Sequence, residues 1–394
     1  MTPSLGSIRA SIDSDRLVER LRTMVATPSE NPPGNEKDVA ELVASYCSEL
    51  ELDTELHEGA PGRPSVVARW EGSPGPTISY CSHIDVVPAG DPRLWDDDPY
   101  GARLDTGTLH GRGSCDAKGP VAAALEAVAA LRQDGWAPKG TLQLDLVADE
   151  EAMGFKGAGY LVEQGISKPQ AAIIGEPTSL RVVRAQRGAC WFSITTKGVA
   201  GHGSAPERGV SAIKHAAEIV LRLEETLPDV SHPVLGGPSV NVGTIHGGAK
   251  VNIVPASCVI EVDRRSIPQE SKEDVLASVQ AAVDLARERF PDIDAEIDFS
   301  FYAPPFEVRE DSYLVQAAVA AVTDTIGAPA QLMGFRGASD ARFLAEAGAE
   351  VIVLGPGDIQ LAHTARESVE IAEVEQAACA YALAFARLFE RQAV

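Results

Sequence analysis

Residue types that commonly bind metals recur at the ends of predicted strands in the first half of the chain. They stand in the segments SHIDVVP (His83 and Asp85), GSCDAKG (Asp116), VADEEAMG (Glu150 and Glu151) and IIGEPTS (Glu176). In open α/β sheets, binding sites form beyond the carboxyl ends of the strands, so we expect these side chains to meet at one sheet edge. A later strand-like run, EVIVLGPG, precedes His363 and adds a fifth element.

Five of these residues form a plausible ligand set with two imidazoles and three carboxylates: His83, Asp116, Glu151, Glu176 and His363. Such a set suits zinc, cobalt or manganese, and zinc is our first expectation. One bridging carboxylate would let five ligands serve two metals, each with three protein groups and an open position for water or substrate. Two metals roughly 3.5–4 Å apart can share a hydroxide and polarise a carbonyl, which is hydrolytic chemistry.

Two further carboxylates are expected to act beside the metals. Asp85 lies two residues after His83 on a strand-like run, so it can orient the imidazole from the same face. Glu150 precedes Glu151 and cannot share its direction on a strand, which leaves it free to act as a general base. Each motif alone also fits a satisfied polar residue, a solvated strand end, a helix cap or a turn. Only their joint order indicates a metal site.

Alternating strand-like and helical runs must position these residues. Short β-rich runs occupy 64–70, 77–87, 141–151 and 171–177, and the alanine-rich segment 118–135 predicts a crossover helix that ends at a glycine. This order predicts an α/β sheet with parallel segments. Further helices are expected near 13–27, 36–50, 209–226, 271–289, 311–325 and from about 371.

The pattern changes after about residue 182. Segments from QRGACWFSITTKG to SCVIEVDRRSI indicate a separate small α+β unit, and the α/β pattern then resumes with AQLMGF and EVIVLGPG. We therefore expect one domain inserted in another. Residues 1–182 and 298–394 would form the catalytic metal-binding domain, and residues 183–297 the insertion.

The composition excludes several classes of partner. The chain has 34 basic and 57 acidic side chains and a formal net charge of −23, which repels nucleic acid and anionic lipid headgroups. The start of the sequence has no apolar signal segment, and no run of 18 uncharged apolar residues occurs. We therefore expect a cytoplasmic protein without a membrane span. Six cysteines stand without CxxC pairs and are expected to be reduced and mostly buried.

The ordered motifs resemble those of the di-zinc deacylase and exopeptidase family that includes acetylornithine deacetylase, succinyl-diaminopimelate desuccinylase, aminoacylase and glutamate carboxypeptidase. The resemblance spans nearly the whole chain and is carried by SHIDVVP, GRGSCDAKG, VADEEAMG, GEPTS, GHGSAP, GGAKVNIVP, DRRSIP, GASDARF and LAHTARE. It implies a zinc-peptidase-like catalytic domain with a mixed, largely parallel sheet and an inserted α+β dimerisation or lid domain.

The resemblance also implies how the ligands are shared. Asp116 would bridge the two metals, with His83 and Glu176 on one metal and Glu151 and His363 on the other. Glu150 would be the base that moves the proton. A cis peptide bond between Asp116 and Ala117 is expected as well.

The inserted domain is expected to supply substrate contacts. By resemblance, His202 of GHGSAP reaches the scissile carbonyl in the other subunit of a homodimer. Asn252 and Arg265 resemble contacts to a substrate carboxylate, although Arg264 competes with Arg265 for the match.

The function expected from these motifs is removal of an acyl group from a small N-acyl amino acid by two divalent metal ions. A carboxypeptidase or dipeptidase on the same scaffold is the alternative enzyme. A non-catalytic binding relative is the alternative of another class, and it is disfavoured because all five ligands and Glu150 are present in order.

Overall fold

The protein is described by a computed structural model that covers residues 3–390. The chain divides into two compact units. Unit 1 comprises the described residues up to Arg184, Val308–Met333 and the described residues from Ser339 onward, and unit 2 comprises Ala185–Glu307 and Gly334–Ala338. No helix within residues 3–390 is both long and apolar enough to cross a membrane.

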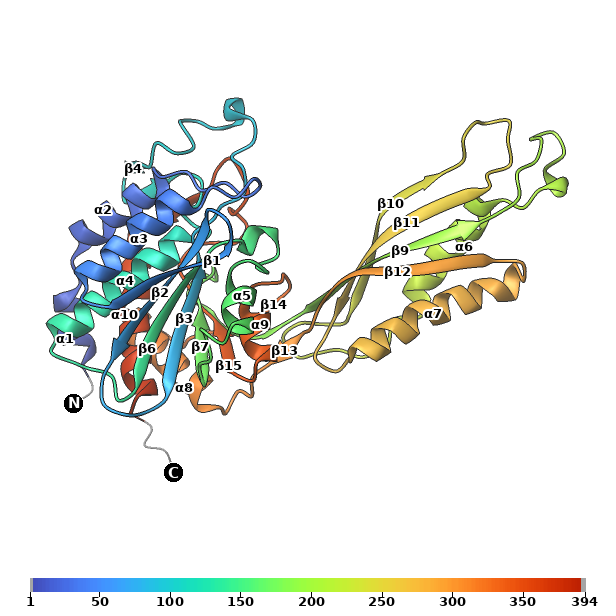
Figure 1. Ribbon diagram of the computed structural model, residues 1–394. Helices are drawn as coiled ribbons and strands as arrows, with labels where there is room; N and C mark the ends of the chain where they lie inside the picture. Colours follow the sequence, from blue (N-terminus) through green and yellow to red (C-terminus); the bar gives the residue numbers. More distant parts are fainter. Residues whose placement is uncertain (1–2, 391–394) are drawn as a thin grey trace. The chain divides into compact units, whose positions relative to one another are not determined.

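Most elements from the start of the chain to Gln186 belong to the large sheet and the helices that cover it (Figure 1). The helices are α1 (Leu5–Ser11), α2 (Ser14–Val25), α3 (Lys37–Glu49), α4 (Lys118–Gln133) and α5 (Ala158–Glu163). The strands are β1 (Asp53–Ala60), β2 (Arg63–Glu71), β3 (Thr77–His83), β4 (Arg103–Asp105), β5 (Thr108–His110), β6 (Thr141–Val147), β7 (Ala171–Ile174) and β8 (Val182–Gln186). Two 3₁₀ turns, η1 (Pro92–Leu94) and η2 (Glu150–Ala152), interrupt the loops.

The remaining elements follow in chain order. The next are β9 (Gly188–Lys197), η3 (Pro206–Arg208), α6 (Ala212–Glu225), β10 (Ser239–Gly247), β11 (Ser257–Ser266), α7 (Lys272–Arg289), β12 (Asp294–Ala303) and β13 (Phe306–Glu307). The last are α8 (Tyr313–Ile326), β14 (Leu332–Phe335), α9 (Ala341–Glu346), β15 (Glu350–Val353), β16 (Ser368–Glu370) and α10 (Ile371–Leu388).

The large sheet is mixed, as the sequence predicted. Its order is β1-β2-β6-β3-β7-β15-β8-β13, and β14 pairs with β8. The four central strands β6, β3, β7 and β15 run parallel, whereas β2 and β8 join them antiparallel. The expected crossover helix is α4, which connects β5 to β6.

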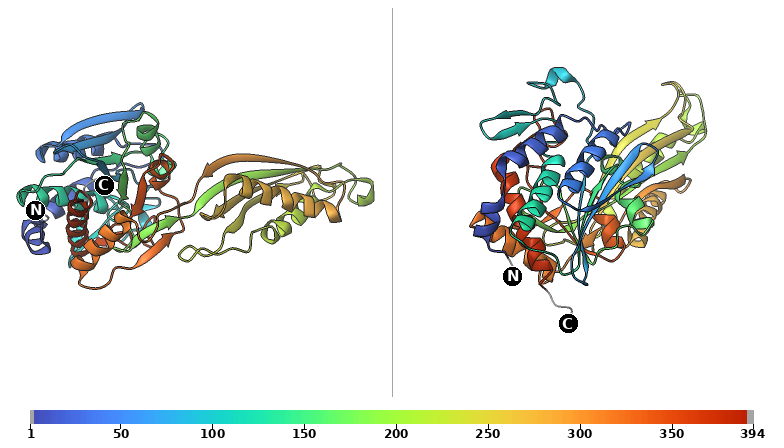
Figure 2. Two further views of the ribbon diagram at one scale, coloured as in Figure 1. Left: turned by 90° about the horizontal axis from the view of Figure 1, so that it is seen from below. Right: turned by 60° about the vertical axis from the view of Figure 1, so that its left-hand side comes forward.

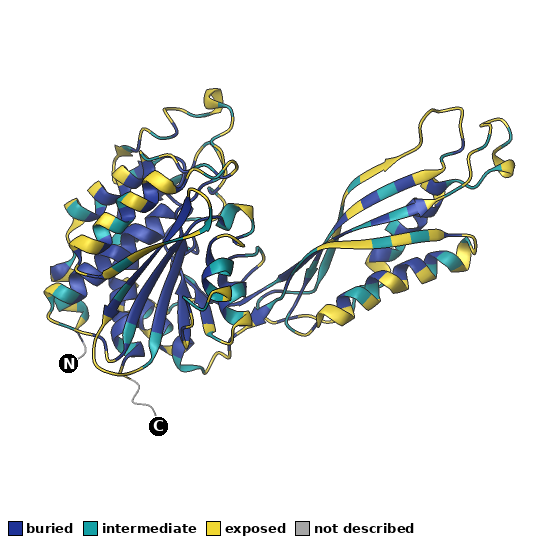
Figure 3. Ribbon diagram, in the orientation of Figure 1, coloured by how far each residue is buried: buried dark blue, intermediate teal, exposed yellow. Residues whose placement is uncertain are grey.

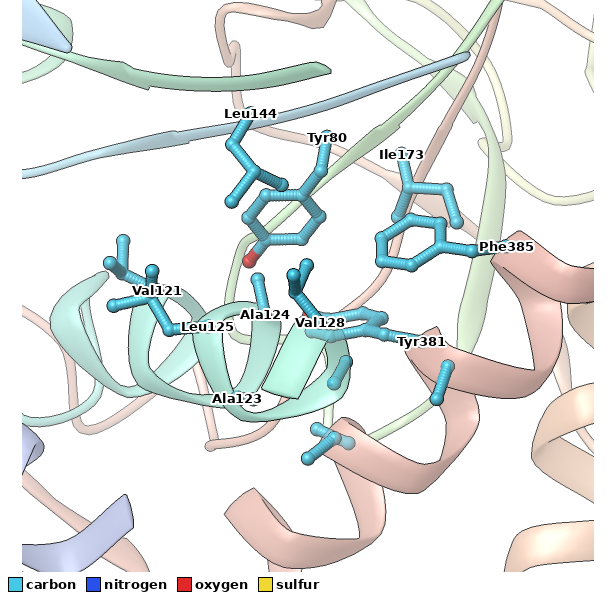
Figure 4. Packing of buried hydrophobic residues seen from close by; sticks show 14 of the residues in the cluster. Tyr80, Val121, Ala123, Ala124, Leu125, Val128, Leu144, Ile173, Tyr381 and Phe385 are labelled. Carbon is cyan, nitrogen blue, oxygen red and sulfur yellow. The ribbon is translucent and has the colours of Figure 1, made fainter. Parts of the chain in front are cut away.

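Helices α4 and α10 form the core of unit 1 against one face of this sheet. Tyr80 of β3 packs edge-on against Tyr381 of α10, with ring centroids 5.1 Å apart, and its hydroxyl donates to the carbonyl of Pro120 at 2.8 Å (Figure 4). Residues Lys118 to Leu131 of α4 are all buried. An alanine-rich helix suits this position because small side chains let the neighbouring helices and the sheet approach closely.

The parallel strands end side by side. His83 at the end of β3 pairs with Val147 at the end of β6, and Cys81 pairs with Ile174 at the end of β7. Ile174 in turn pairs with Val353 of β15. The loops that follow these four strands therefore leave the sheet at one edge, where a site is expected in this class of fold.

Unit 2 is a four-stranded antiparallel sheet in the order β10-β11-β9-β12, with α6 and α7 packed on one face (Figure 2). Buried residues alternate with exposed or partly buried ones along β11, whereas the central strands β3 and β6 of the large sheet are buried after their first residue (Figure 3). The sequence analysis ended the insertion at residue 297. Unit 2 continues to Glu307 because β12 pairs with β9 as far as Ala303.

The six cysteines are all buried, and none of them forms a disulfide within the described residues. The burial agrees with the expectation from the sequence. The expected cis peptide bond between Asp116 and Ala117 is also present.

Candidate metal centre

The structure brings all five ligand candidates together in unit 1. His83 is the last residue of β3, Asp116 lies just before α4, and Glu151 lies in the turn η2 after β6. Glu176 follows β7, and His363 follows β15 in a backbone conformation with φ of 62°. Residues other than glycine seldom adopt positive φ, so the fold holds His363 in an uncommon backbone conformation.

The Asp116 carboxylate occupies the middle of the cluster. Its Oδ1 lies 3.0 Å from Nε2 of His83, and its Oδ2 lies 3.3 Å from Nε2 of His363. Each carboxylate oxygen therefore faces a different imidazole. This is the arrangement that a carboxylate shared between two metals requires.

The other two carboxylates lie one on each side of Asp116. An oxygen of Glu176 is 3.9 Å from Nε2 of His83, and an oxygen of Glu151 is 3.1 Å from Nε2 of His363. Ligand atoms of His83, Asp116 and Glu151 all lie within 4.8 Å of one another. The donor set and its compactness fit divalent metals such as zinc.

The protonation behaviour of the metal-free cluster follows from mutual contact of acids and imidazoles. Hydrogen bonds to Asp116 and Glu151 raise the pKa of His363 to about 10. Burial opposes ionisation of Asp116, but hydrogen bonds from His363 and His83 bring its pKa well below the usual range. Burial, with the charge of Asp116 and other neighbours, raises the pKa of Glu176 well above normal even though His83 opposes this. Such crowding of like charges is expected where a divalent cation is to bind.

Asp85 lies close to His83, but its contacts differ from those expected. Nδ1 of His83 lies 2.8 Å from the backbone oxygen of Asp85 and 3.6 Å from its carboxylate. The backbone carbonyl accepts the Nδ1 proton, which leaves Nε2 as the ring nitrogen that faces Asp116 and that could bind a metal once it has lost its proton. The Asp85 carboxylate instead accepts the backbone N–H groups of Glu150 and Glu151, each at 3.2 Å.

The sequence placed Glu150 and Glu151 on a strand, but in the structure the strand ends before them. They form the turn η2, which begins after Asp149 in a left-handed conformation with φ of 72°. Their different directions therefore come from a tight turn and not from strand alternation. Burial, followed by the negative charge of Glu176, raises the pKa of Glu150 well above its ordinary value.

The candidates for substrate contacts, His202, Asn252 and Arg265, belong to unit 2. His202 is exposed, and its Nδ1 accepts the backbone N–H of Ser204 at 3.1 Å. Asn252 is also exposed. Arg264 is buried in an ion pair with Glu270, whereas Arg265 is partly exposed and lies 2.9 Å from Asp263. Arg265 is thus the accessible member of the pair left open by the sequence.

Four residues that form buried ion pairs beside the cluster were not predicted from the sequence: Arg63, Asp149, Arg112 and Glu367. Arg63 is buried between Glu36 and Asp149, and Arg112 is buried against Glu367. Arg112, Asp149 and Glu367 all stand within the quoted motifs, so their positions offered a signal. Nothing in the sequence around Arg63 pointed to its partners.

Two proteins with related sequences are an acetylornithine deacetylase and a succinyl-diaminopimelate desuccinylase. The chain is 33% identical over 312 residues to an acetylornithine deacetylase of Myxococcus xanthus, covering 77% of this chain and 78% of that protein. It is 26% identical over 369 residues to a succinyl-diaminopimelate desuccinylase of Hydrogenovibrio crunogenus, covering 91% of this chain and 95% of that protein.

Solved structures share the fold at lower identity. The aminopeptidase PepT of Bacillus cereus has a TM-score of 0.81 at 22% identity, over 96% of this chain and 100% of that one. A dinuclear metal-binding peptidase of Bacillus subtilis has a TM-score of 0.74 at 18% identity, over 96% of this chain and 98% of that one. The sequence model of peptidase family M20/M25/M40 matches residues 80–387, a span that holds every ligand candidate. The protein with this mixed sheet and acidic–imidazole cluster therefore belongs to peptidase family M20/M25/M40.

Proposed function

We propose that the protein hydrolyses the amide bond of a small N-acyl amino acid at a two-metal centre. The observation that carries this proposal is the Asp116 carboxylate, whose two oxygens face His83 and His363 separately. The family match and the deacylases among the relatives support the reaction class.

Asp116 would be shared by both metals, with His83 and Glu176 completing one site and Glu151 and His363 the other. When bound, the metals supply Lewis acidity toward the carbonyl and toward water. The donor set supports zinc as the metal, and cobalt or manganese would also fit it. The dinuclear relative in Bacillus subtilis supports a count of two.

Glu150 is proposed to carry the proton. Its carboxylate would accept a proton from the attacking water and return it to the nitrogen of the departing amine. The Asp85 carboxylate fixes the backbone of this turn by accepting the N–H of Glu150 at 3.2 Å. The products would be a carboxylic acid and a free amino acid.

His202 is proposed to polarise the scissile carbonyl. Because Nδ1 accepts the N–H of Ser204, the neutral imidazole carries its proton on Nε2 and presents that N–H as a donor. A donor of this kind stabilises negative charge that develops on a carbonyl oxygen.

Arginines of unit 2 support recognition of a carboxylate. Arg187 donates to the carbonyls of Leu235 and Gly237 at 2.6 and 2.7 Å. Burial and then the positive charges of Arg336, Arg265 and Arg264 lower its pKa. Cationic groups therefore gather in unit 2 of a chain whose net charge is −23, and we propose that Arg265, together with Asn252, contacts the substrate carboxylate.

Two further properties belong to this proposal. Six free, buried cysteines support a reducing compartment and hence a cytoplasmic location. The family resemblance supports a homodimer in which His202 serves the site of the other subunit.

A substrate panel tests the reaction. We expect kcat/KM for N-acetyl or N-succinyl amino acids to exceed that for dipeptides and tripeptides by at least tenfold. Faster turnover of peptides would show that the enzyme acts as a carboxypeptidase or dipeptidase and not as a deacylase. If a protein loaded with two metals turned over none of these substrates, the result would favour the alternative of a non-catalytic binding protein.

A further inference from the structure

The loop that carries Asp116 has little regular structure of its own. It connects β5 to α4 and contains Gly111 and Gly113 with φ of 148° and 84°. A Cβ atom on Gly113 would lie 2.6 Å from Cγ1 of Val86, so a larger residue there is excluded by space as well as by conformation. Such a loop needs outside partners to fix the carboxylate of Asp116.

Glu367 supplies those partners. Its Oε1 accepts the backbone N–H groups of Gly113 at 2.9 Å, Cys115 at 3.2 Å and Asp116 at 3.1 Å. Three backbone N–H groups within four residues of the loop thus point at one oxygen atom. The other oxygen, Oε2, pairs with Nη1 of Arg112 in the same loop.

Burial makes these contacts costly to lose. The side chains of Arg112 and Glu367 are 3% and 0% exposed. Removal of Glu367 would leave a buried guanidinium and three backbone donors without their acceptor. Arg112 and the three backbone N–H groups contact both oxygens of Glu367, so the loop occupies this carboxylate.

Glu367 also connects Asp116 to the far end of the sequence. It stands four residues after His363, whose Nε2 lies 3.3 Å from Oδ2 of Asp116. The backbone oxygen of Glu367 accepts the N–H of Gly111 at 3.1 Å, and the next residue, Ser368, begins the pairing of β16 with β5. One short segment therefore presents an imidazole to Asp116 and holds the backbone of Asp116, 251 residues away in sequence.

We propose that Glu367 is a positioning residue that sets the Asp116 carboxylate between His83 and His363, and thereby determines metal affinity without binding a metal. This inference rests on the metal centre of the proposed function. It does not depend on which amide is the substrate.

The test measures cobalt(II) binding in the absence of substrate. Purified, metal-free wild-type protein, Glu367→Gln and Glu367→Ala are titrated with cobalt(II) against a chelator, and the visible absorption bands of the bound ion are recorded. Supporting partners of metal ligands typically contribute about 10- to 100-fold in affinity. We expect a loss in that range for Glu367→Ala with altered bands, and a smaller loss for Glu367→Gln, which keeps an acceptor for the N–H groups.

Glu126 in the middle of α4 provides the matched control. Its side chain is 1% exposed and accepts Nε and Nη2 of Arg16 at 2.9 and 2.7 Å and the N–H of Asp13 at 2.7 Å. Glu126→Ala should lower the melting temperature but leave the cobalt spectrum unchanged and the affinity within about twofold of wild type, since it removes a buried carboxylate, paired with the partly exposed Arg16, away from Asp116.

Two results would overturn the proposal. One is a Glu367→Ala protein that melts earlier, as Glu126→Ala does, but binds cobalt with wild-type affinity and spectrum. The other applies if Glu367→Ala does not fold: Glu367→Gln then decides, and unchanged cobalt binding by that folded variant refutes the positioning role. A substrate panel that pointed to peptides would change the proposed reaction and leave this result intact.

Discussion

At the scale of single residues, two neighbouring carboxylates are proposed to divide metal binding and proton transfer between them. An oxygen of Glu151 lies 3.1 Å from Nε2 of His363. The pKa of Glu150, in contrast, is raised mainly by burial and then by the charge of Glu176. Their contacts differ although the residues are adjacent in the chain. The difference can be measured because the two roles respond differently to removal of the side chain.

Glu150→Ala should keep close to two metals per chain and lose about 10²–10⁴-fold in kcat, which is the typical contribution of a general base. Glu151→Ala should retain about one metal. Elemental analysis and steady-state kinetics of both purified variants make the comparison. Equal metal loss in the two variants would show that the roles of the two carboxylates have been misassigned.

The metal-free protein should lose stability as the pH rises. Contact with Asp116 and Glu151 raises the pKa of His363 from 6.5 to about 10. The native state therefore binds this proton more tightly than the unfolded chain, so the stabilisation is complete below pH 6.5 and disappears as the pH rises through 10. Urea unfolding of metal-free protein between pH 6 and 10 should show this decline, and His363→Gln should flatten it.

Metal binding should depend on pH in the opposite direction. The metal must displace the proton on His363, so affinity should rise between pH 6.5 and 10. Calorimetry in buffers of different ionisation enthalpy should report release of about one proton or more per chain. Affinity that is independent of pH over this range would contradict the assignment of His363 as a ligand.

At the scale of elements, the turn η2 is held at its start, at Asp149. Asp149 and Met153 flank it with φ of 72° and 82°. Nη1 of Arg63 lies 2.7 Å from Oδ1 of Asp149, and the same guanidinium pairs with Glu36. These buried contacts keep a turn with two uncommon backbone conformations at the edge of the sheet.

Arg63→Met should destabilise the protein by about 3–5 kcal/mol, because it leaves the buried carboxylates of Glu36 and Asp149 without their partner. Urea unfolding of the metal-free protein measures the change. Lys197→Met, which removes an exposed ion pair with Glu296, is the control and should leave the unfolding midpoint unchanged. A similar midpoint for both variants would mean that Arg63 does not support the turn.

The sequence predicted the elements whose signal is local. The helices α2, α3, α4, α6, α7, α8 and α10 and the central strands lie close to their expected ranges. The hairpin strand β1 and the edge strand β12 were not anticipated, since their exposed residues lack the apolar runs of central strands. Contacts between distant segments, such as Arg63 with Asp149 and Glu367 with Asp116, leave no local pattern and appear only in the fold.

At the scale of the whole molecule, the proposed homodimer remains a prediction that an exchange experiment can decide. The two inactive variants His202→Ala and Glu150→Ala are mixed and their subunits exchanged. If His202 serves the other subunit, each heterodimer has one site with both residues intact. Random pairing gives about half heterodimers with one working site of two, so about a quarter of wild-type activity should return.

A second mixture controls for nonspecific recovery. Glu150→Ala removes the proposed base and Asp116→Ala the proposed bridging ligand, each from the site of its own chain, so no heterodimer of this pair contains an intact site. It should stay inactive. If the first mixture also stays inactive after mass spectrometry verifies exchange, His202 does not act across subunits.

The insertion of unit 2 imposes an order on assembly during synthesis. His83, Asp116, Glu151 and Glu176 precede Ala185, whereas His363 and Glu367 follow Glu307. At about 5–20 residues per second, translation of the intervening stretch separates the two groups by on the order of ten seconds. Until then, the nascent chain carries three carboxylates and one imidazole without the segment that orients Asp116. If these residues bind metal as proposed, loading would therefore be a late event, completed only after the segment with His363 and Glu367 has left the ribosome.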